Sequence, residues 1–178
     1  MRRLAVLLVT GLAPAILGAQ AKFRLTSPTV RDGARIPMEH VFNGFGCTGG
    51  NVSPALAWTN PPAGTKSFAI TMYDPDAPTG SGWWHWTIFN LSAGTTSLAA
   101  GASAAPPAGS VQGRTDFGSS SYGGPCPPPG TPHRYVFTVF ALKVERLDLD
   151  AQASGAMVGF NLNATVLAKA TLTATFGR

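Results

Sequence analysis

Three short clusters in the sequence carry the carboxylate, imidazole and phenol groups from which a binding or catalytic site could be built. In Asp74–Pro78 (DPDAP), two prolines restrict the backbone, so two carboxylates are held rigidly in a loop. Gly82–Trp86 (GWWHW) places one histidine at the start of an apolar strand. Residues 123–135 join paired glycines to a polyproline run and then place His133 and Tyr135 two positions apart, so that both point the same way from a strand. Each cluster alone also fits a structural role: a solvated turn, a core histidine or a rigid connector.

If these clusters meet in one pocket, one chemistry open to them is the binding of an anion, since paired glycines let backbone N–H groups approach it closely. If a carboxylate of the first cluster accepts a hydrogen bond from His85 or His133, it favours the protonated ring, and the imidazolium can hold a phosphate. A zwitterionic ligand also fits, with its phosphate on the histidines, Tyr135 and the backbone near Gly124, and its ammonium against a carboxylate or a tryptophan face. For phosphate alone we expect weak affinity, which falls as rising pH removes the protons of the histidines.

Catalysis is the competing interpretation. The two histidines with Asp74 or Asp76 could supply a two-histidine, one-carboxylate metal set. Cys126 and His133 could form a nucleophile pair, but that pair requires a free thiol. The sequence contains no HExxH, CxxC or GxSxG motif. We therefore expect a protein that is not an enzyme and that uses neither a metal nor a cofactor.

The polar clusters lie at the ends of runs that alternate like β-strands. Four such runs are residues 67–74, 84–91, 133–142 and 171–176. In the second run, strict alternation places His85 with Phe89 on one face and Trp86 with Ile88 on the other. Trp58 and Trp86 are assigned to packing.

One segment, residues 153–169, has the spacing of a helix. Its apolar stripe is ragged and consists of Met157, Phe160, Leu162, Val166 and Leu167. Glycine and proline occupy 36 of the 178 positions, too many for a helix bundle. Long strands without alternating helices predict a single all-β domain of two packed antiparallel sheets.

The beginning of the chain has the layout of a secretory signal peptide, which we assign to residues 1–21. The layout consists of a positive start (Met1–Arg3), an apolar run (Leu4–Leu17) and a small-residue cleavage site (Ala19–Ala21). A domain of residues 22–178 would then be secreted or periplasmic, with no integral membrane segment after signal removal. Loss of the two leader arginines lowers the formal net charge from +5 to +3. The remaining basic residues are scattered, which argues against a nucleic-acid partner.

Cys47 and Cys126 are the two cysteines of the chain. In an oxidising compartment two thiols in one small domain usually pair, so we expect a disulfide. Two buried free thiols, or one reactive thiol, are the alternatives. A bridge closing so long a loop would contribute roughly 4–5 kcal/mol in the chain-entropy model.

Taken together, four segments resemble the signature of the phosphatidylethanolamine-binding protein family, and in particular its bacterial, Raf kinase inhibitor-like branch. They are Asn51–Leu56 (NVSPAL) with Trp58, DPDAP at 74–78, WHW at 84–86 and GGPCPPPGTPHRY at 123–135. Each segment alone is a weak signal, but the four stand in the order and spacing of the family over most of the chain after residue 21.

The resemblance implies a Greek-key, β-sandwich-like fold of two antiparallel sheets with one or two short helices. It also implies a small anion pocket at one end, for phosphate-type or phosphoethanolamine-like headgroups. By position, the pocket would be formed by Asp74, Asp76, Trp84 or its neighbour, His85, Gly124, His133 and Tyr135. The chain ends soon after its last strand, which predicts a more open site than in eukaryotic members.

Two further points follow from the resemblance. Asn161 and Asn163 stand where bacterial relatives often carry a histidine. Some family members are described as inhibitors of proteases or kinases that act through the pocket rim. A protein-interaction module with a protein partner is therefore the alternative to a binding protein for a small anionic or zwitterionic phospho-ligand.

Overall fold

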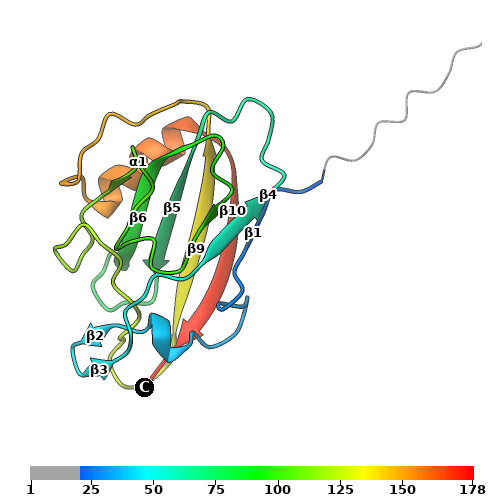
Figure 1. The fold of residues 1–178 in the computed structure, drawn as a ribbon. Coiled ribbons are helices and arrows are strands. Elements are labelled where there is room, and N and C mark those ends of the chain that lie inside the picture. The colour runs from blue at the N-terminus through cyan, green and yellow to red at the C-terminus, as the bar shows by residue number, and fades with distance from the viewer. Residues whose placement is uncertain (1–20) are drawn as a thin grey trace, which may run out of the picture.

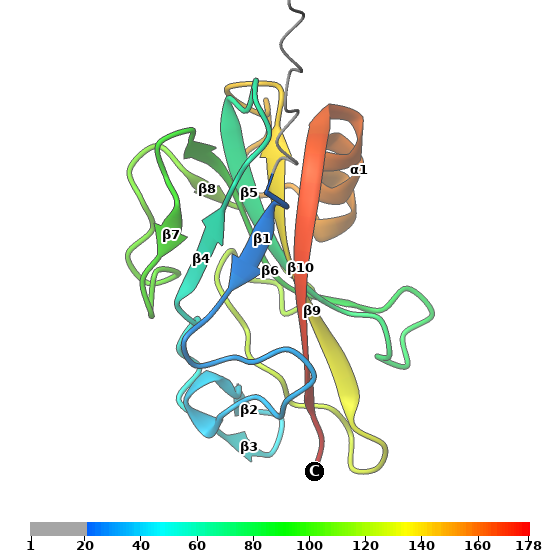
Figure 2. The ribbon, with the colours of Figure 1, turned by 90° about the vertical axis from the view of Figure 1, so that its right-hand side faces the viewer.

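The β-branched and aromatic runs form a five-stranded antiparallel sheet in the computed structural model, which describes residues 21–178. Its strands, in spatial order, are β10 (Val166–Phe176), β9 (His133–Leu142), β5 (Ser67–Asp74), β6 (Trp83–Ser92) and β8 (Val111–Gln112). A second antiparallel sheet packs over one face and consists of β1 (Arg24–Thr26), β4 (Leu56–Thr59) and β7 (Ser97–Leu98) (Figures 1 and 2). The predicted fold class, with two antiparallel sheets, is confirmed.

The remaining elements are short. They are the 3-10 helix η1 (Met38–His40), the strand pair β2 (Asn43–Gly44) and β3 (Cys47–Thr48), and the helix α1 (Gly155–Thr165). Residues 1–20, which make up nearly all of the predicted signal peptide, lie outside the described part of the chain. Within residues 21–178, no helix has the length and apolar character needed to cross a membrane.

An apolar core fills the space between the two sheets. Alternate residues of β5 and β9 enter it, namely Phe68, Ile70, Met72, Tyr135, Phe137 and Val139. Trp58 and Trp86 are buried in the same core, which confirms their predicted packing role. Full burial of one large apolar side chain contributes about 1.5–3 kcal/mol. This core therefore fixes the register of the strands whose ends carry the polar clusters.

Helix α1 covers the opposite face of the five-stranded sheet, so the molecule has three layers (Figure 2). Val158 and Leu162 of the helix pack against a second apolar cluster that includes Phe89 and Phe140. Ser154 caps the helix, since its side chain accepts a hydrogen bond from the backbone N–H of Met157.

The helix predicted over residues 153–169 is shorter than expected. It ends at Thr165, and β10 begins at Val166, five residues before the strand predicted at 171–176. Val166 has an extended backbone and pairs with β9, so the β-ladder replaces the last turns of the expected helix. Met157 and Phe160, which were assigned to the apolar stripe, are exposed.

Candidate functional site

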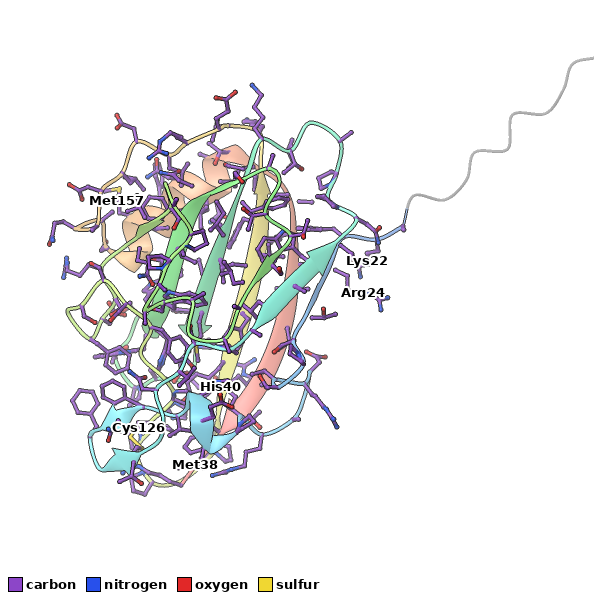
Figure 3. All side chains as sticks on the ribbon, in the orientation of Figure 1. Lys22, Arg24, Met38, His40, Cys126 and Met157 are labelled. Carbon is purple, nitrogen blue, oxygen red and sulfur yellow. A yellow bond between two sulfur atoms is a disulfide. The ribbon has the colours of Figure 1, made fainter. Side chains whose placement is uncertain are left out.

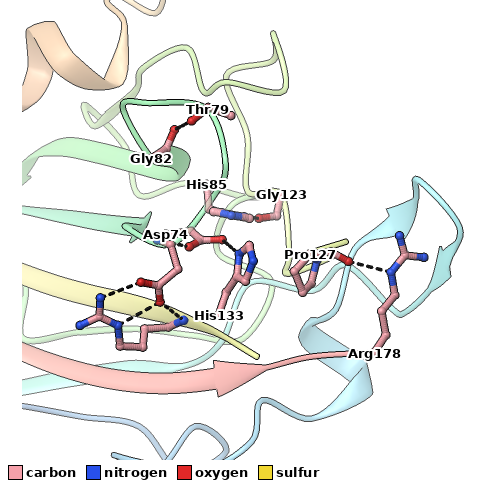
Figure 4. Close-up of polar contacts among 10 residues, drawn as sticks. Asp74, Thr79, Gly82, His85, Gly123, Pro127, His133 and Arg178 are labelled. Carbon is pink, nitrogen blue, oxygen red and sulfur yellow. Dashed lines mark hydrogen bonds and ion pairs between the residues drawn. The ribbon is translucent and has the colours of Figure 1, made fainter. Parts of the chain in front are cut away.

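A cavity of about 220 Å³ opens where β5, β6 and β9 meet the loops at one end of the sheet. Its polar lining consists of Asp74, Thr79, His85, His133 and Tyr135. The rest of the wall is formed mainly by aromatic rings, prolines and one cysteine of the disulfide: Phe45, Ala77, Pro78, Trp83, Phe117, Cys126, Pro127 and Pro128. Figure 4 shows the polar contacts in this region.

Asp74 and His133 form a buried pair in the cavity wall. The Nδ1 atom of His133 lies 2.7 Å from Oδ2 of Asp74, and the two side chains are only 12% and 4% exposed (Figure 4). The other carboxylate oxygen, Oδ1, accepts the backbone N–H of Asp76 at 2.8 Å. Both carboxylate oxygens are therefore engaged, and the imidazole is held in one orientation.

A β-bulge in β6 determines which side chains of this strand reach the cavity. Met72 of β5 pairs with Trp86, whereas Tyr73 pairs with Trp84, so His85 is an extra residue without a partner on β5. A bulge of this kind turns two successive side chains toward the same side of the sheet.

Because of this bulge, the side chains of β6 do not occupy the two faces of the sheet as strict alternation predicted. His85 does not share the face of Phe89 but lines the cavity, where its ring packs edge-on against Tyr135 at 5.1 Å between centroids. The same shift brings Trp83 into the cavity wall in place of Trp84.

His85 is neutral at physiological pH. Burial lowers its pKa to about 4, against the ordinary value of 6.5. Its Nδ1 atom lies 2.7 Å from the carbonyl oxygen of Gly123, which can only accept, so Nδ1 carries the hydrogen (Figure 4). The Nε2 atom then bears a lone pair. The predicted imidazolium is therefore wrong for His85, which offers the cavity an acceptor.

Tyr135 brings a hydroxyl group to the same cavity. Its oxygen is buried and makes no hydrogen bond within residues 21–178. Burial raises the pKa of this phenol, and the nearby charge of Asp74 raises it further, so the group stays protonated. The hydroxyl therefore keeps its proton close to the Asp74 carboxylate but makes no well-formed hydrogen bond to it, and it can donate to a ligand in the cavity.

Aromatic rings form the outer wall. Phe117 stacks with Phe45 at 5.9 Å between ring centroids and meets Trp83 edge-on at 5.4 Å. Phe45 is 67% exposed and has a φ of 52°, between two glycines that also have positive φ values. The disulfide Cys47–Cys126 joins the β2–β3 hairpin that carries Phe45 to residues 126–128, which also line the cavity. The disulfide expected from the sequence is thus present.

The loop of residues 123–132 is fixed by contacts outside the cavity. The Nε atom of Arg178 donates to the carbonyl of Pro127 at 2.7 Å (Figure 4). The backbone N–H of Gly124, which we expected to face a ligand, instead donates to Oδ1 of Asn51 at 2.8 Å. A Cβ atom at Gly124 would lie 2.1 Å from the carbonyl oxygen of His40, so this glycine is required for close packing.

Asp76 and Trp84 also lie outside the cavity. Asp76 accepts two hydrogen bonds from the Arg134 side chain, at 2.9 and 2.7 Å, and this guanidinium lowers the pKa of Asp76 to about 2. Trp84 packs against Tyr73 at 4.7 Å between ring centroids, on the side of the sheet that faces α1.

Of the seven residues assigned to the pocket, the structure brings four together around the cavity: Asp74, His85, His133 and Tyr135. Phe45 and Phe117 were not predicted as cavity residues, because they lie in loops without a periodic pattern. For Phe45, the sequence offered one clue: the flanking glycines Gly44 and Gly46 mark a tight turn that can expose the side chain between them. Across the described residues, no three side chains of the His, Cys, Asp or Glu types are grouped so that they could hold a metal ion.

Comparisons with known proteins agree with one another. Residues 26–177 match the family model described as phosphatidylethanolamine-binding protein. The UPF0098 protein YbhB of Escherichia coli strain K12 is 56% identical over 156 residues, which are 86% of this chain and 99% of YbhB. The UPF0098 protein YbcL of the same strain is 52% identical over 158 residues, 86% of each chain. The crystal structure of E. coli YbcL aligns with a TM-score of 0.87 at 51% identity, over 89% of this chain and 99% of that one.

Proposed function

Because the chain belongs to the phosphatidylethanolamine-binding protein family, we propose that its cavity binds a small phosphate-type headgroup, such as that of phosphoethanolamine, without catalysis. The observation that carries this proposal is the unbonded Tyr135 hydroxyl, which lines the same cavity as the Asp74–His133 pair. A buried polar group without a partner costs about 1–3 kcal/mol. A phosphate oxygen placed beside the hydroxyl would supply the missing hydrogen bond.

His133 provides the second contact to the phosphate. Its Nδ1 faces Asp74, and its Nε2 makes no hydrogen bond within residues 21–178. With Nδ1 held by Asp74, an N–H at Nε2 would donate to a phosphate oxygen of the ligand. The neutral His85 accepts a hydrogen bond from an acidic O–H of a phosphate or from an ammonium group.

The aromatic wall favours a zwitterion over inorganic phosphate. The rings of Trp83 and Phe117 line the cavity beside the polar groups. An ammonium group over such a ring gains about 0.5–2 kcal/mol, with the larger values in desolvated sites. We therefore expect phosphoethanolamine to bind more tightly than phosphate alone.

We also propose that the protein works in a secreted or periplasmic location. The disulfide Cys47–Cys126 supports this part of the proposal, because such bonds persist in oxidising compartments. The predicted leader at residues 1–21 has the composition that export requires.

The test is an NMR titration of residues 22–178 with phosphoethanolamine, following the ring signals of His85 and His133. Saturable shifts in both rings are expected, and inorganic phosphate should require higher concentrations to cause them. Tyr135→Phe, which removes only the hydroxyl, should weaken phosphoethanolamine binding about tenfold.

Tyr122→Phe is the matched control. The Tyr122 hydroxyl is also buried, but it donates to the carbonyl of His40 and does not line the cavity. This variant should lose stability but keep the affinity of the wild type. An absence of ring shifts in the folded protein, or equal losses of affinity in the two tyrosine variants, would overturn the proposal.

A further inference from the structure

The outward side of α1 is apolar, although a surface helix normally carries charged side chains there. Phe160 is 73% exposed and Met157 is 51% exposed. Ala156 and Ala164 are exposed beside them, so the four apolar side chains share one side of the helix. We call these four residues the outer face of α1. Asn163 is the one other exposed residue of the helix, and the helix sequence contains no aspartate, glutamate, lysine or arginine.

The inward side of α1 has its own apolar contacts, since Val158 and Leu162 pack against the sheet. A helix that is apolar on both sides is typical of one that is buried on both sides. Single exposed apolar residues are common on protein surfaces, but a contiguous patch marks an interaction site. Figure 3 shows Met157 beside α1, whereas Met38, which is also 51% exposed, lies at the opposite end of the molecule. The outer face of α1 is therefore open to a partner.

The two ends of α1 carry opposite charges. Asp150 precedes the helix, and its carbonyl accepts the backbone N–H of Ala153 at 3.2 Å. Lys143 lies at the other end, where its backbone N–H donates to the carbonyl of Thr165 at 3.0 Å. The side chains of Asp150 and Lys143 are exposed, and neither forms a salt bridge within residues 21–178. An acidic group near the N-terminus of a helix and a basic group near its C-terminus also agree with the helix dipole.

Neighbouring charges leave this asymmetry in place. Near the N-terminal end of α1, the exposed Asp148 adds a negative charge and the exposed Arg114 adds a positive one. Near the C-terminal end, Lys66 and Lys169 are positive and Glu145 is negative, and all three are exposed. One end of α1 is therefore acidic on balance, and the other end is basic on balance.

A second copy of the chain complements these features. Ala156 and Ala164 stand four residues before and four residues after Phe160. A twofold axis beside Phe160 therefore brings Ala156 of one copy against Ala164 of the other, and these small side chains allow the two helices to pack closely. The same antiparallel arrangement places the acidic end of each helix beside the basic end of the other.

A lipid surface is the competing occupant, but it fits less well. Helices that lie in a membrane interface carry lysine and arginine beside their apolar side. The helix α1 carries neither, and Asp148 and Asp150 near its N-terminal end would be repelled by anionic headgroups.

We propose that the protein forms a twofold-symmetric dimer in which the outer faces of two antiparallel α1 helices pack together. Phe160 lies at the axis and supplies the apolar centre of the interface. Asp150 of each copy lies beside Lys143 of the other copy and fixes the antiparallel orientation. Interfaces of this limited size associate reversibly, so monomer and dimer should exchange.

Sedimentation equilibrium of residues 22–178 tests the dimer, which should form as the protein concentration rises. Phe160→Asp and Met157→Asp should each weaken dimerisation at least about tenfold, because a carboxylate would be buried against an apolar surface. Met38→Asp is the matched control, since Met38 is as exposed as Met157 but lies at the opposite end of the molecule. This control should dimerise as the wild type does.

Three results of this experiment would overturn the proposal. The first is a wild-type protein that stays monomeric up to about 1 mM. The second is dimerisation that Phe160→Asp does not weaken, which would assign the dimer to another surface. The third is an equal loss in Met157→Asp and Met38→Asp.

Charge exchange tests the antiparallel orientation. Asp150→Lys and Lys143→Asp should each weaken the dimer about fivefold, because like charges then meet at both ends of the interface. The double variant Asp150→Lys/Lys143→Asp restores opposite charges and should dimerise within about twofold of the wild type. Urea unfolding checks that each variant is folded. A folded double variant that dimerises no better than either single variant would contradict the proposed pairing and overturn it.

Cosedimentation with phosphatidylglycerol vesicles tests the competing occupant. Vesicle binding that Phe160→Asp abolishes, in a protein that does not dimerise, would assign the outer face of α1 to a lipid surface and overturn the proposal. None of the four residues of this face lines the cavity at Asp74 and His133. The dimer and the binding of phosphoethanolamine are therefore tested separately.

Discussion

Asp74 is the last residue of β5 and His133 is the first residue of β9, and their side chains meet at 2.7 Å between Oδ2 and Nδ1. The two strands are neighbours in the sheet, and both continue into the core between the sheets. Strand register, rather than loop conformation, therefore sets the geometry of this pair. A site built on strand ends is held more precisely than one built on mobile loops.

Asp74→Asn should weaken phosphoethanolamine binding about tenfold, because asparagine cannot balance a positive charge on His133. Asp76→Asn is the matched control, since Asp76 pairs with Arg134 outside the cavity. The control should bind within about twofold of the wild type. Isothermal titration of both variants makes the comparison. A similar loss in both would contradict the assignment of Asp74 to the site.

His85 should make the stability of the protein depend on pH. Its pKa is about 4 in the folded protein and about 6.5 when exposed, so between these values the unfolded chain binds a proton that the folded chain does not. The free energy of unfolding should therefore fall as pH drops from about 6.5 to about 4, by about 3 kcal/mol at most.

His85→Gln provides the comparison for this pH effect, because glutamine can still donate to Gly123 but does not titrate. Urea unfolding of both proteins at several pH values gives the difference in stability between them. We expect this difference to shrink as the pH falls through the window. Parallel curves would show that His85 does not carry the effect.

Reduction of the disulfide should affect both stability and binding. Cys47 and Cys126 are 79 residues apart, which corresponds to about 4–5 kcal/mol in the chain-entropy model. Reduced protein should also bind phosphoethanolamine more weakly, because the hairpin with Phe45 is no longer tied to residues 126–128 of the cavity wall. Urea unfolding and titration, each with and without dithiothreitol, measure the two effects. The double variant Cys47→Ala/Cys126→Ala should not respond to the reductant; a response would trace the effect to another cause.

Gly155→Ala should destabilise the fold, although alanine normally stabilises a helix by about 1 kcal/mol relative to glycine. A Cβ atom at Gly155 would lie 2.2 Å from Cγ of Trp84, so α1 could no longer lie against the sheet. The expected cost is about 1–3 kcal/mol in urea unfolding. Gly94→Ala is the control, because the nearest atom to a new Cβ there, Oγ of Ser92, is 4.0 Å away. A stabilised Gly155→Ala protein would show that the helix can shift freely.

The strands were predictable where the sequence marks their ends. β5 and β9 have the bounds predicted at 67–74 and 133–142, because Pro75 ends one strand and Pro132 precedes the other. The junction of α1 and β10 was not predictable in the same way. Its apolar residues fit a helical period as well as a strand period, and pairing with β9 decides between them.

The site was predictable only in part, for a related reason. Spacing within one strand correctly placed His133 and Tyr135 on one face, and the end of β5 placed Asp74 beside them. Trp83 lines the cavity, and Trp84 does not, because of the bulge. A bulge is a property of two paired strands, so the sequence of β6 alone does not reveal it. The backbone N–H of Gly124 was expected to face a ligand, but a tertiary contact with Asn51 occupies it.

Because of the extra residue in β6, the side chains that line the cavity depend on the number of residues in this strand as well as on their types. Deleting Trp84 would restore strict alternation and place the imidazole of His85 and the indole of Trp86 on opposite faces of the sheet. A homologue could therefore keep every pocket residue type and still present a different surface to its ligand. In a sheet of this kind, ligand preference can diverge by insertion and deletion as readily as by point mutation.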